Sequence, residues 1–180
     1  FTYSIFLKFI GGLNPLTFFR KMKDVVLFAF STSSSAATIP VTLRTVNQDL
    51  GVNQNVASFV VPVGATINMD GTAIMQGLAT VFIAQMSGID LTLFQYIQVV
   101  LLAVATSIGT AAVPSAGTIT LIIILQQFNL PLEAIGIILA VDRVLDMIRT
   151  SVNVTGDAAI ACIVAKTENQ LDENIFNSKA

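Results

Sequence analysis

Five polar side chains, with charges of both signs, recur along one apolar stretch and could bind a charged ligand. Their intervals of four, three, four and four residues place neighbours on one helical face: Asp142, Asp146, Arg149, Asn153 and Asp157. Arg149 could hold a carboxylate through two parallel hydrogen bonds, and Asp146 could accept an ammonium group. An acidic amino acid would satisfy both residues, whereas a charge network that only joins helices is the structural alternative.

Carboxylates in two glycine-containing segments indicate a cation site. Asp70 lies in NMDGT and Asp157 in NVTGD, and both offer hard anionic oxygens to a small cation. We expect the adjacent glycines to let the helices unwind and turn backbone carbonyl groups toward that cation. Sodium fits such ligands better than zinc or copper. The same carboxylates could instead carry a proton, and Asn68 with Asp70 could simply join helices.

The composition favours a protein whose solvent is a lipid bilayer. Of 180 residues, 54% are hydrophobic and 11% are charged, against about 25% charged residues in soluble domains. The net charge of -2, without a basic block, argues against nucleic-acid binding. The chain has no histidine and one cysteine, Cys162, which removes Ser-His and Cys-His nucleophile pairs and any intramolecular disulfide.

Long apolar stretches, most of them broken by polar residues, predict an all-α membrane protein. We expect the end of a transmembrane helix and a cytoplasmic basic loop over 1–23. A transport core over 24–166 would contain hairpin 1, helix 7, hairpin 2 and helix 8, over 24–45, 56–86, 91–128 and 132–165. We expect a solvated, disordered polar tail over 167–180.

These segments form an internal repeat of inverted topology. The hairpin tips are STSSSAATIP and SIGTAAVPSAGT, and in the first tip the serines and Pro40 disfavour a continuous helix. Each crossing carries Asn-x-x-Gly, at Asn68 and at Asn153. Since one crossing separates the hairpins, we expect re-entrant hairpins that enter from opposite sides and two interrupted transmembrane helices. Such pairs indicate a transporter site near the middle of the membrane.

Four segments, in this order, resemble the signature segments of the glutamate/aspartate and dicarboxylate cation symporter family: STSSSAATIP, GATINMDGT, SIGTAAVPSAGT and LDMIRTSVNVTGD. The resemblance covers nearly the whole chain. It implies a transport domain that moves by an elevator motion against a trimeric scaffold. Because the chain begins at Phe1 inside an apolar stretch, we expect a fragment that lacks most of the scaffold and does not transport alone.

The resemblance also implies the site residues. The substrate would be lined by Ser34, Ser35, Thr72, Val113, Gly117, Asp146, Arg149, Thr150 and Asn153. Arg149 would bind its side-chain carboxylate and Asp146 its amino group. One sodium ion would be held by Gly64, Asn68, Asn153 and Asp157, and a second, largely through backbone carbonyls, by Thr66, Ser107, Ile108 and Thr110. A third would use Asn68, Asp70 and ligands outside this chain.

The chain also departs from the family pattern. Ser33 stands where some relatives have arginine; Arg143 could replace that charge, or Met147 could mark a different cation coupling. Ala112 and Ser115 replace glycines at the second tip, which bears on the flexibility of that tip.

We therefore predict a multi-pass cell-membrane symporter, not an enzyme, that moves L-aspartate or L-glutamate with sodium ions and is a homotrimer when complete. Its partners would be a small acidic molecule and the bilayer, with no nucleic acid. Asp146 favours an amino acid over a dicarboxylate, and Asp157 favours sodium over protons. The alternatives are a sodium- or proton-coupled symporter of C4-dicarboxylates or neutral amino acids, and an anion-conducting channel. An intramembrane enzyme is a weaker alternative.

Overall fold

The computed structural model describes residues 1–178, and this part of the chain is all-α, as predicted. It contains no sheet, and its isolated β-bridge joins Val52 to Leu171. In chain order the helices are α1 (Thr2–Phe9), α2 (Pro15–Lys21), α3 (Lys23–Thr32), α4 (Ser35–Arg44), the π-helical η1 (Thr45–Asp49), α5 (Gln54–Ile67), α6 (Asp70–Met86), α7 (Leu93–Ile108), α8 (Ala116–Gln127), the 3-10 helix η2 (Leu132–Ala134), α9 (Ile135–Thr167) and α10 (Glu173–Asn177).

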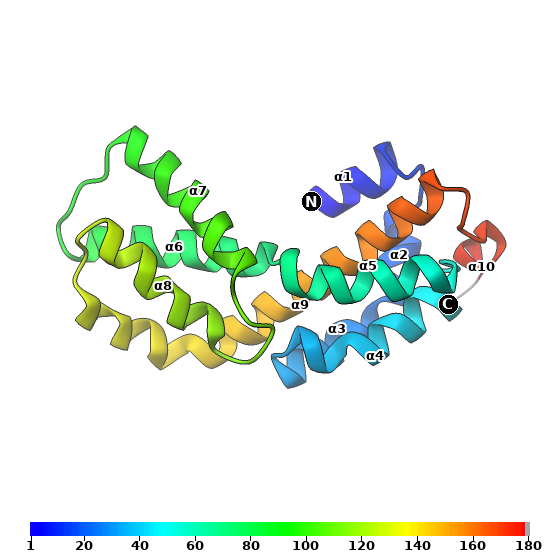
Figure 1. Cartoon of the computed structure of the whole chain (residues 1–180), viewed down its shortest axis with the longest axis horizontal. Coiled ribbons are helices and arrows are strands. Elements are labelled where there is room, and N and C mark those ends of the chain that lie inside the picture. Colours follow the sequence, from blue (N-terminus) through cyan, green and yellow to red (C-terminus); the bar gives the residue numbers. More distant parts are fainter. Residues whose placement is uncertain (179–180) are drawn as a thin grey trace.

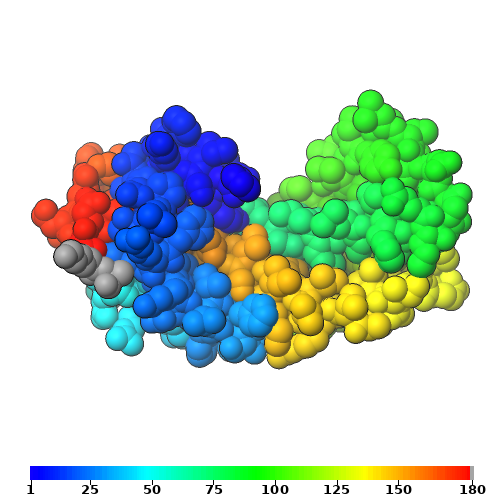
Figure 2. Space-filling view, turned by 180° about the vertical axis from the view of Figure 1, so that it is seen from behind, coloured from blue at the N-terminus to red at the C-terminus, as the bar shows by residue number. Residues whose placement is uncertain are grey.

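The long helix α9 is the spine of the molecule (Figure 1). Around its C-terminal half lie α1 to α5, with a core that includes Phe18, Val61 and Ala158. Around its N-terminal half lie α6, α7 and α8, with a second core that includes Ile83, Leu121 and Ile138. The two groups of helices leave a hollow between α1 and the α6–α7 segment, which the view from behind shows (Figure 2). The polar middle of α9 lies where the two groups meet.

Helices α3 and α4 form one helical hairpin, and the break between them falls at two serines. Ser33 ends α3 in the left-handed region, with φ of 52°. The side chain of Ser34 then caps α4 by accepting a hydrogen bond from the Ala37 amide at 3.2 Å. Pro40, which we expected to oppose a continuous helix, lies inside α4. The serine cap, and not the proline, therefore sets the tip.

Helices α7 and α8 form a second hairpin whose tip meets the first. The Ser34 hydroxyl donates to the Ala112 carbonyl oxygen at 2.8 Å, and the Ala36 amide donates to the same oxygen at 3.3 Å. Residues far apart in the sequence thus close over the middle of α9.

Of the two helix interruptions that we predicted, one is present, and the prediction of the other is wrong. The region 56–86 holds α5 and α6, which break at Asn68 and Met69. By contrast, α9 is continuous through Gly156. A lone glycine costs a helix only about 1 kcal/mol, and here it allows close packing. A Cβ added at Gly156 would lie 2.3 Å from the Tyr3 hydroxyl oxygen and 2.6 Å from Asn68 Nδ2.

The polar tail is ordered as far as the structure describes it, which corrects our expectation. Phe176 of α10 is fully buried. The Lys21 ammonium donates to the carbonyl oxygens of Asp49 and Ile175, at 2.8 and 2.6 Å, and to Ser178 Oγ at 3.1 Å. Burial lowers the pKa of Lys21, against the opposing effect of the Asp49 charge. Residues 179 and 180 lie outside the described residues.

Within residues 1–178, no helix combines the length and the apolar character that would let it cross a membrane.

Candidate functional site

The five residues of the predicted polar face of α9 are all buried. Their exposed fractions are 4% for Asp142, 0% for Asp146, 5% for Arg149, 2% for Asn153 and 2% for Asp157. They are covered by the hairpin tips and by α5 and α6, because α9 packs against all of these elements. Buried charges require partners, so the contacts of this face define the site.

Arg149 lies at the centre of the face and is only partly satisfied. Its Nη2 pairs with Asp146 one turn earlier. Its Nη1 is buried and has no hydrogen-bond partner among the described residues. The second hairpin comes very close to this nitrogen, because a Cβ added at Gly117 would lie 1.7 Å from it. A larger residue at position 117 would require the Arg149 side chain to move, and the orphan nitrogen is a donor for an anionic group.

A cavity of about 10 Å³ lies between the two hairpin tips and the middle of α9. Six of the nine predicted substrate residues line it: Ser35, Thr72, Val113, Arg149, Thr150 and Asn153. The other three lie beside it: Ser34 bonds across the tips, Gly117 contacts Arg149, and Asp146 pairs with Arg149. The structure therefore brings the predicted substrate residues together, in a space far smaller than an amino acid.

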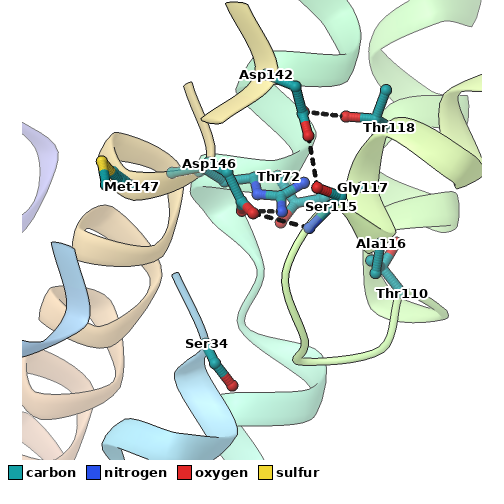
Figure 3. Close-up of polar contacts among 12 residues, drawn as sticks. Ser34, Thr72, Thr110, Ser115, Ala116, Gly117, Thr118, Asp142, Asp146 and Met147 are labelled. Atoms are coloured by element: carbon teal, nitrogen blue, oxygen red, sulfur yellow. Dashed lines mark hydrogen bonds and ion pairs between the residues drawn. The ribbon is translucent and has the colours of Figure 1, made fainter. Parts of the chain in front are cut away.

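Two residues that differ from the family pattern, Ser33 and Ala112, line the cavity. Ser33 lines it with a buried hydroxyl that has no partner among the described residues, and Ala112 lines it from the second tip. Arg143 is exposed and reaches Ser31, whose carbonyl oxygen lies 3.5 Å from its Nη2. Met147 points away from the second tip (Figure 3). Of the two candidates, Arg143 is hydrogen-bonded to the start of the first tip.

Three of the four residues predicted for the first cation site lie together. Asn68 Nδ2 donates to Asp157 Oδ1 at 2.9 Å, and a Cβ added at Gly64 would lie 2.6 Å from the same oxygen. They open onto a groove of about 370 Å³ whose other lining residues are apolar. Asn153 is turned elsewhere, since its Oδ1 accepts from the Gly71 amide at 2.7 Å.

The second predicted cation set occupies helix ends. Thr66 is next to last in α5, and Ser107 and Ile108 end α7. These two helices are in contact. The hydroxyls of Thr66 and Ser107 bond carbonyl groups of their own helices, and Thr110 bonds Thr106 and Thr120. Backbone carbonyl groups at helix C-termini lack partners within the helix and carry partial negative charge, so such ends favour a cation.

The third predicted cation set includes a neighbour that our sequence reasoning missed. The Tyr3 hydroxyl donates to Asp70 Oδ2 at 2.6 Å, beside Asn68 and Gly156. The phenol in this mostly apolar N-terminal segment was the available signal, but no spacing links it to Asp70, 67 positions later.

Gln76 was also missed, and it holds the second hairpin to α6. Its side chain donates to the Gly117 carbonyl oxygen at 3.1 Å and to Thr120 Oγ1 at 2.6 Å, and it accepts from Thr106 Oγ1 at 2.9 Å. Its position in an otherwise apolar helix, one turn after Thr72, was the feature of the sequence that could have indicated a buried polar contact. Both arms of the hairpin are thus fixed to α6.

Comparison with known proteins places the chain in a family. Residues 1–167 match the model of the sodium:dicarboxylate symporter family. The chain belongs to this family. Over 151 residues, 84% of the chain, it is 48% identical to a Caenorhabditis elegans excitatory amino acid transporter and to human excitatory amino acid transporter 2. It is 48% identical over 167 residues, 92% of the chain, to mouse excitatory amino acid transporter 3.

The matched region is a minor part of these relatives. It covers 30% of the Caenorhabditis elegans protein, 26% of the human protein and 32% of the mouse protein. The family whose model matches is one of symporters.

Proposed function

We propose that this chain forms the substrate and ion sites of a symporter that moves an acidic amino acid, L-aspartate or L-glutamate, with sodium ions. The substrate carboxylates, its amino group and the cations would each bind a different part of the α9 face. The names of the relatives, excitatory amino acid transporters, support an amino-acid substrate.

The observation that carries this proposal is the unpartnered Nη1 of Arg149. A buried guanidinium nitrogen without a hydrogen bond costs about 1–3 kcal/mol or more. A substrate carboxylate would satisfy it and could bond the guanidinium through both oxygens. Thr72 and Asn153, which line the same cavity, would supply further polar contacts.

Asp146 supports an amino acid over a simple dicarboxylate. Its Oδ1 pairs with Arg149 and its Oδ2 accepts from the Ser115 amide at 2.7 Å. When a substrate carboxylate takes Arg149, the substrate ammonium group can replace that guanidinium on Asp146. The two charges of the pair would then each face an opposite charge of the ligand.

Sodium as the coupled ion is supported by the oxygen atoms around the break between α5 and α6. Asp157 lies against that break through Asn68 and Gly64, and Asp70 follows it. The adjoining C-termini of α5 and α7 add carbonyl groups. Hard oxygen donors of this kind suit a small alkali or alkaline-earth cation.

The complete protein would lie in the cell membrane, as a trimer whose transport domain moves by an elevator motion. The hairpins α3–α4 and α7–α8 would be re-entrant, with the site near the middle of the bilayer. Large apolar side chains exposed along α7, among them Leu93, Phe94 and Leu101, support contact with lipid or with protein outside this chain.

Equilibrium binding tests the proposal. The protein in its full natural length, in detergent, should bind L-aspartate in sodium chloride and lose most of that affinity in choline chloride. Succinate should bind at least about tenfold more weakly, because it lacks the ammonium group for Asp146. Equal binding of succinate would favour the dicarboxylate alternative, and sodium-independent binding would contradict sodium coupling.

A further inference from the structure

Tyr3 of α1 holds the carboxylate of Asp70, the first residue of α6. The Tyr3 hydroxyl donates to Asp70 Oδ2 at 2.6 Å, a short hydrogen bond of the kind that a hydroxyl forms with a charged carboxylate. Within residues 1–178, no lysine or arginine forms an ion pair with Asp70. The carboxylate is therefore held by a neutral group, and none of the described side chains neutralises its charge.

A glycine of α9 makes room for the Tyr3 ring. A Cβ added at Gly156 would lie 2.3 Å from the Tyr3 hydroxyl oxygen and 2.8 Å from Tyr3 Cζ. The same Cβ would lie 2.6 Å from Asn68 Nδ2, which donates to Asp157 Oδ1 at 2.9 Å. The phenol and the amide thus lie together over one residue of α9. From there, each bonds one of the two carboxylates that we assign to cations, Asp70 and Asp157.

The hydrogen bond from Tyr3 engages one oxygen of Asp70 and leaves the other free. It uses Oδ2, and Oδ1 has no hydrogen-bond donor among residues 1–178. Asp70 is exposed, so an ion can reach that oxygen. A partner that hydrogen-bonds a metal-binding carboxylate orients it, and loss of such a partner lowers metal affinity by about ten- to a hundredfold. By fixing Oδ2, the Tyr3 hydroxyl therefore fixes the direction in which Oδ1 points.

We propose that Tyr3 is a positioning residue for the cation that Asp70 binds: its hydroxyl orients the carboxylate so that Oδ1 faces the ion. The inference rests on the proposed function, in which Asp70 contributes to an ion site. Because α1 carries Tyr3, this helix becomes part of that ion site. If the hydrogen bond only joined α1 to α6, its loss would lower the stability of the protein and leave its response to sodium unchanged.

The sodium dependence of L-aspartate binding, measured on the protein in its full natural length, tests this role. Tyr3→Phe removes the hydroxyl and keeps the ring. We expect the sodium concentration for half-maximal L-aspartate binding to rise by about tenfold or more, with little change in L-aspartate affinity at saturating sodium. Tyr96→Phe is the matched control, since Tyr96 is the other tyrosine of this chain and is exposed on α7.

Thermal unfolding separates ion binding from stability. Sodium without L-aspartate should raise the melting temperature of the unmodified protein and of Tyr96→Phe, because an ion that binds only the folded state stabilises it. For Tyr3→Phe the same rise should require about tenfold more sodium. In sodium-free buffer the melting temperatures of the three proteins should differ little, because water can replace the hydroxyl at the exposed Asp70.

Two results would overturn the role of Tyr3. One is a sodium response of Tyr3→Phe equal to that of the unmodified protein, whether or not its melting temperature in sodium-free buffer falls. The other is an L-aspartate affinity that falls by the same factor at every sodium concentration. Binding of L-aspartate by the unmodified protein without sodium would contradict the proposed function instead, and the melting temperatures with sodium alone would still test Tyr3.

Discussion

Arg149 shows how a single residue can be buried and still open to a ligand. One of its terminal nitrogens is paired with Asp146 and the other has no partner within residues 1–178. The pairing holds the guanidinium in place, while the orphan nitrogen favours any anion that reaches the cavity. The spacing of polar residues in α9 predicted the face on which Arg149 lies, because the helical period alone determines which residues share a face.

Replacing Arg149 should separate substrate binding from ion binding. We expect Arg149→Lys to weaken L-aspartate binding by about ten- to a hundredfold, because a lysine cannot bond a carboxylate in the same two-pronged way. Sodium affinity measured without substrate should change much less. Titration calorimetry of both ligands makes the comparison, with the exposed Arg143→Lys as control. Unchanged L-aspartate affinity would remove Arg149 from the substrate site.

Asp157 should determine the sodium response. Asp157→Asn keeps an oxygen that can accept from Asn68 but removes the negative charge next to the α5–α6 break. We expect the sodium concentration for half-maximal L-aspartate binding to rise by about tenfold or more. The exposed loop variant Asp90→Asn should behave like the unmodified protein. A normal sodium response of Asp157→Asn would exclude this carboxylate from the ion site.

Contacts between residues that are far apart in the chain could not be predicted from the sequence. Tyr3 and Asp70 are 67 positions apart in the chain, with α2 to α5 between them, yet they are hydrogen-bonded. Gln76 contacts the second hairpin through side-chain geometry that no local pattern encodes. Asp142 also bonds Ser115 and Thr118, which a sequence alone does not align with α9.

Helices differ in what a glycine does within them, and this explains the wrong expectation for α9. The break between α5 and α6 falls at Asn68 and Met69 and not at Gly71, which is helical. Gly71 instead allows α6 to touch α9, since an added Cβ would lie 2.4 Å from the Arg149 carbonyl oxygen. Sequence shows where glycines are, but only the packing shows whether a glycine permits a break or a contact.

A matched pair of glycine substitutions tests this packing. Gly71→Ala forces a methyl group against the α9 backbone and should destabilise the protein by about 1–3 kcal/mol. Gly77→Ala in the same helix meets no atom within 4 Å and should be neutral or stabilising by up to about 1 kcal/mol. Thermal unfolding in detergent measures both. Equal melting temperatures for the two variants would contradict the close approach of α6 to α9.

The whole molecule consists of two helix groups on one spine, with its described C-terminal segment folded back onto the N-terminal part. Composition predicted a polar tail, but the tail contains an apolar residue, Phe176, that is fully buried. The segment around Phe176 is hydrogen-bonded to Lys21 and, through Gly51 and Asn53, to the loop after η1. A single aromatic residue in a polar segment gives too weak a pattern to predict docking.

Lys21 should decide whether this segment stays docked. Lys21→Met removes three hydrogen bonds that join α2 to residues 49, 175 and 178. We expect limited proteolysis to cut between 167 and 178 at least several-fold faster in this variant, while α9 stays protected. The exposed Lys23→Met is the control. Equal cleavage rates in both variants would show that the apolar contacts of Phe176 suffice.

Uptake of L-aspartate into liposomes that contain the protein in its full natural length tests the central proposal most directly. An inward sodium gradient should drive uptake, its removal should abolish uptake, and excess succinate should inhibit only weakly. Uptake driven by a proton gradient alone, or strong inhibition by succinate, would contradict a sodium-coupled carrier of acidic amino acids.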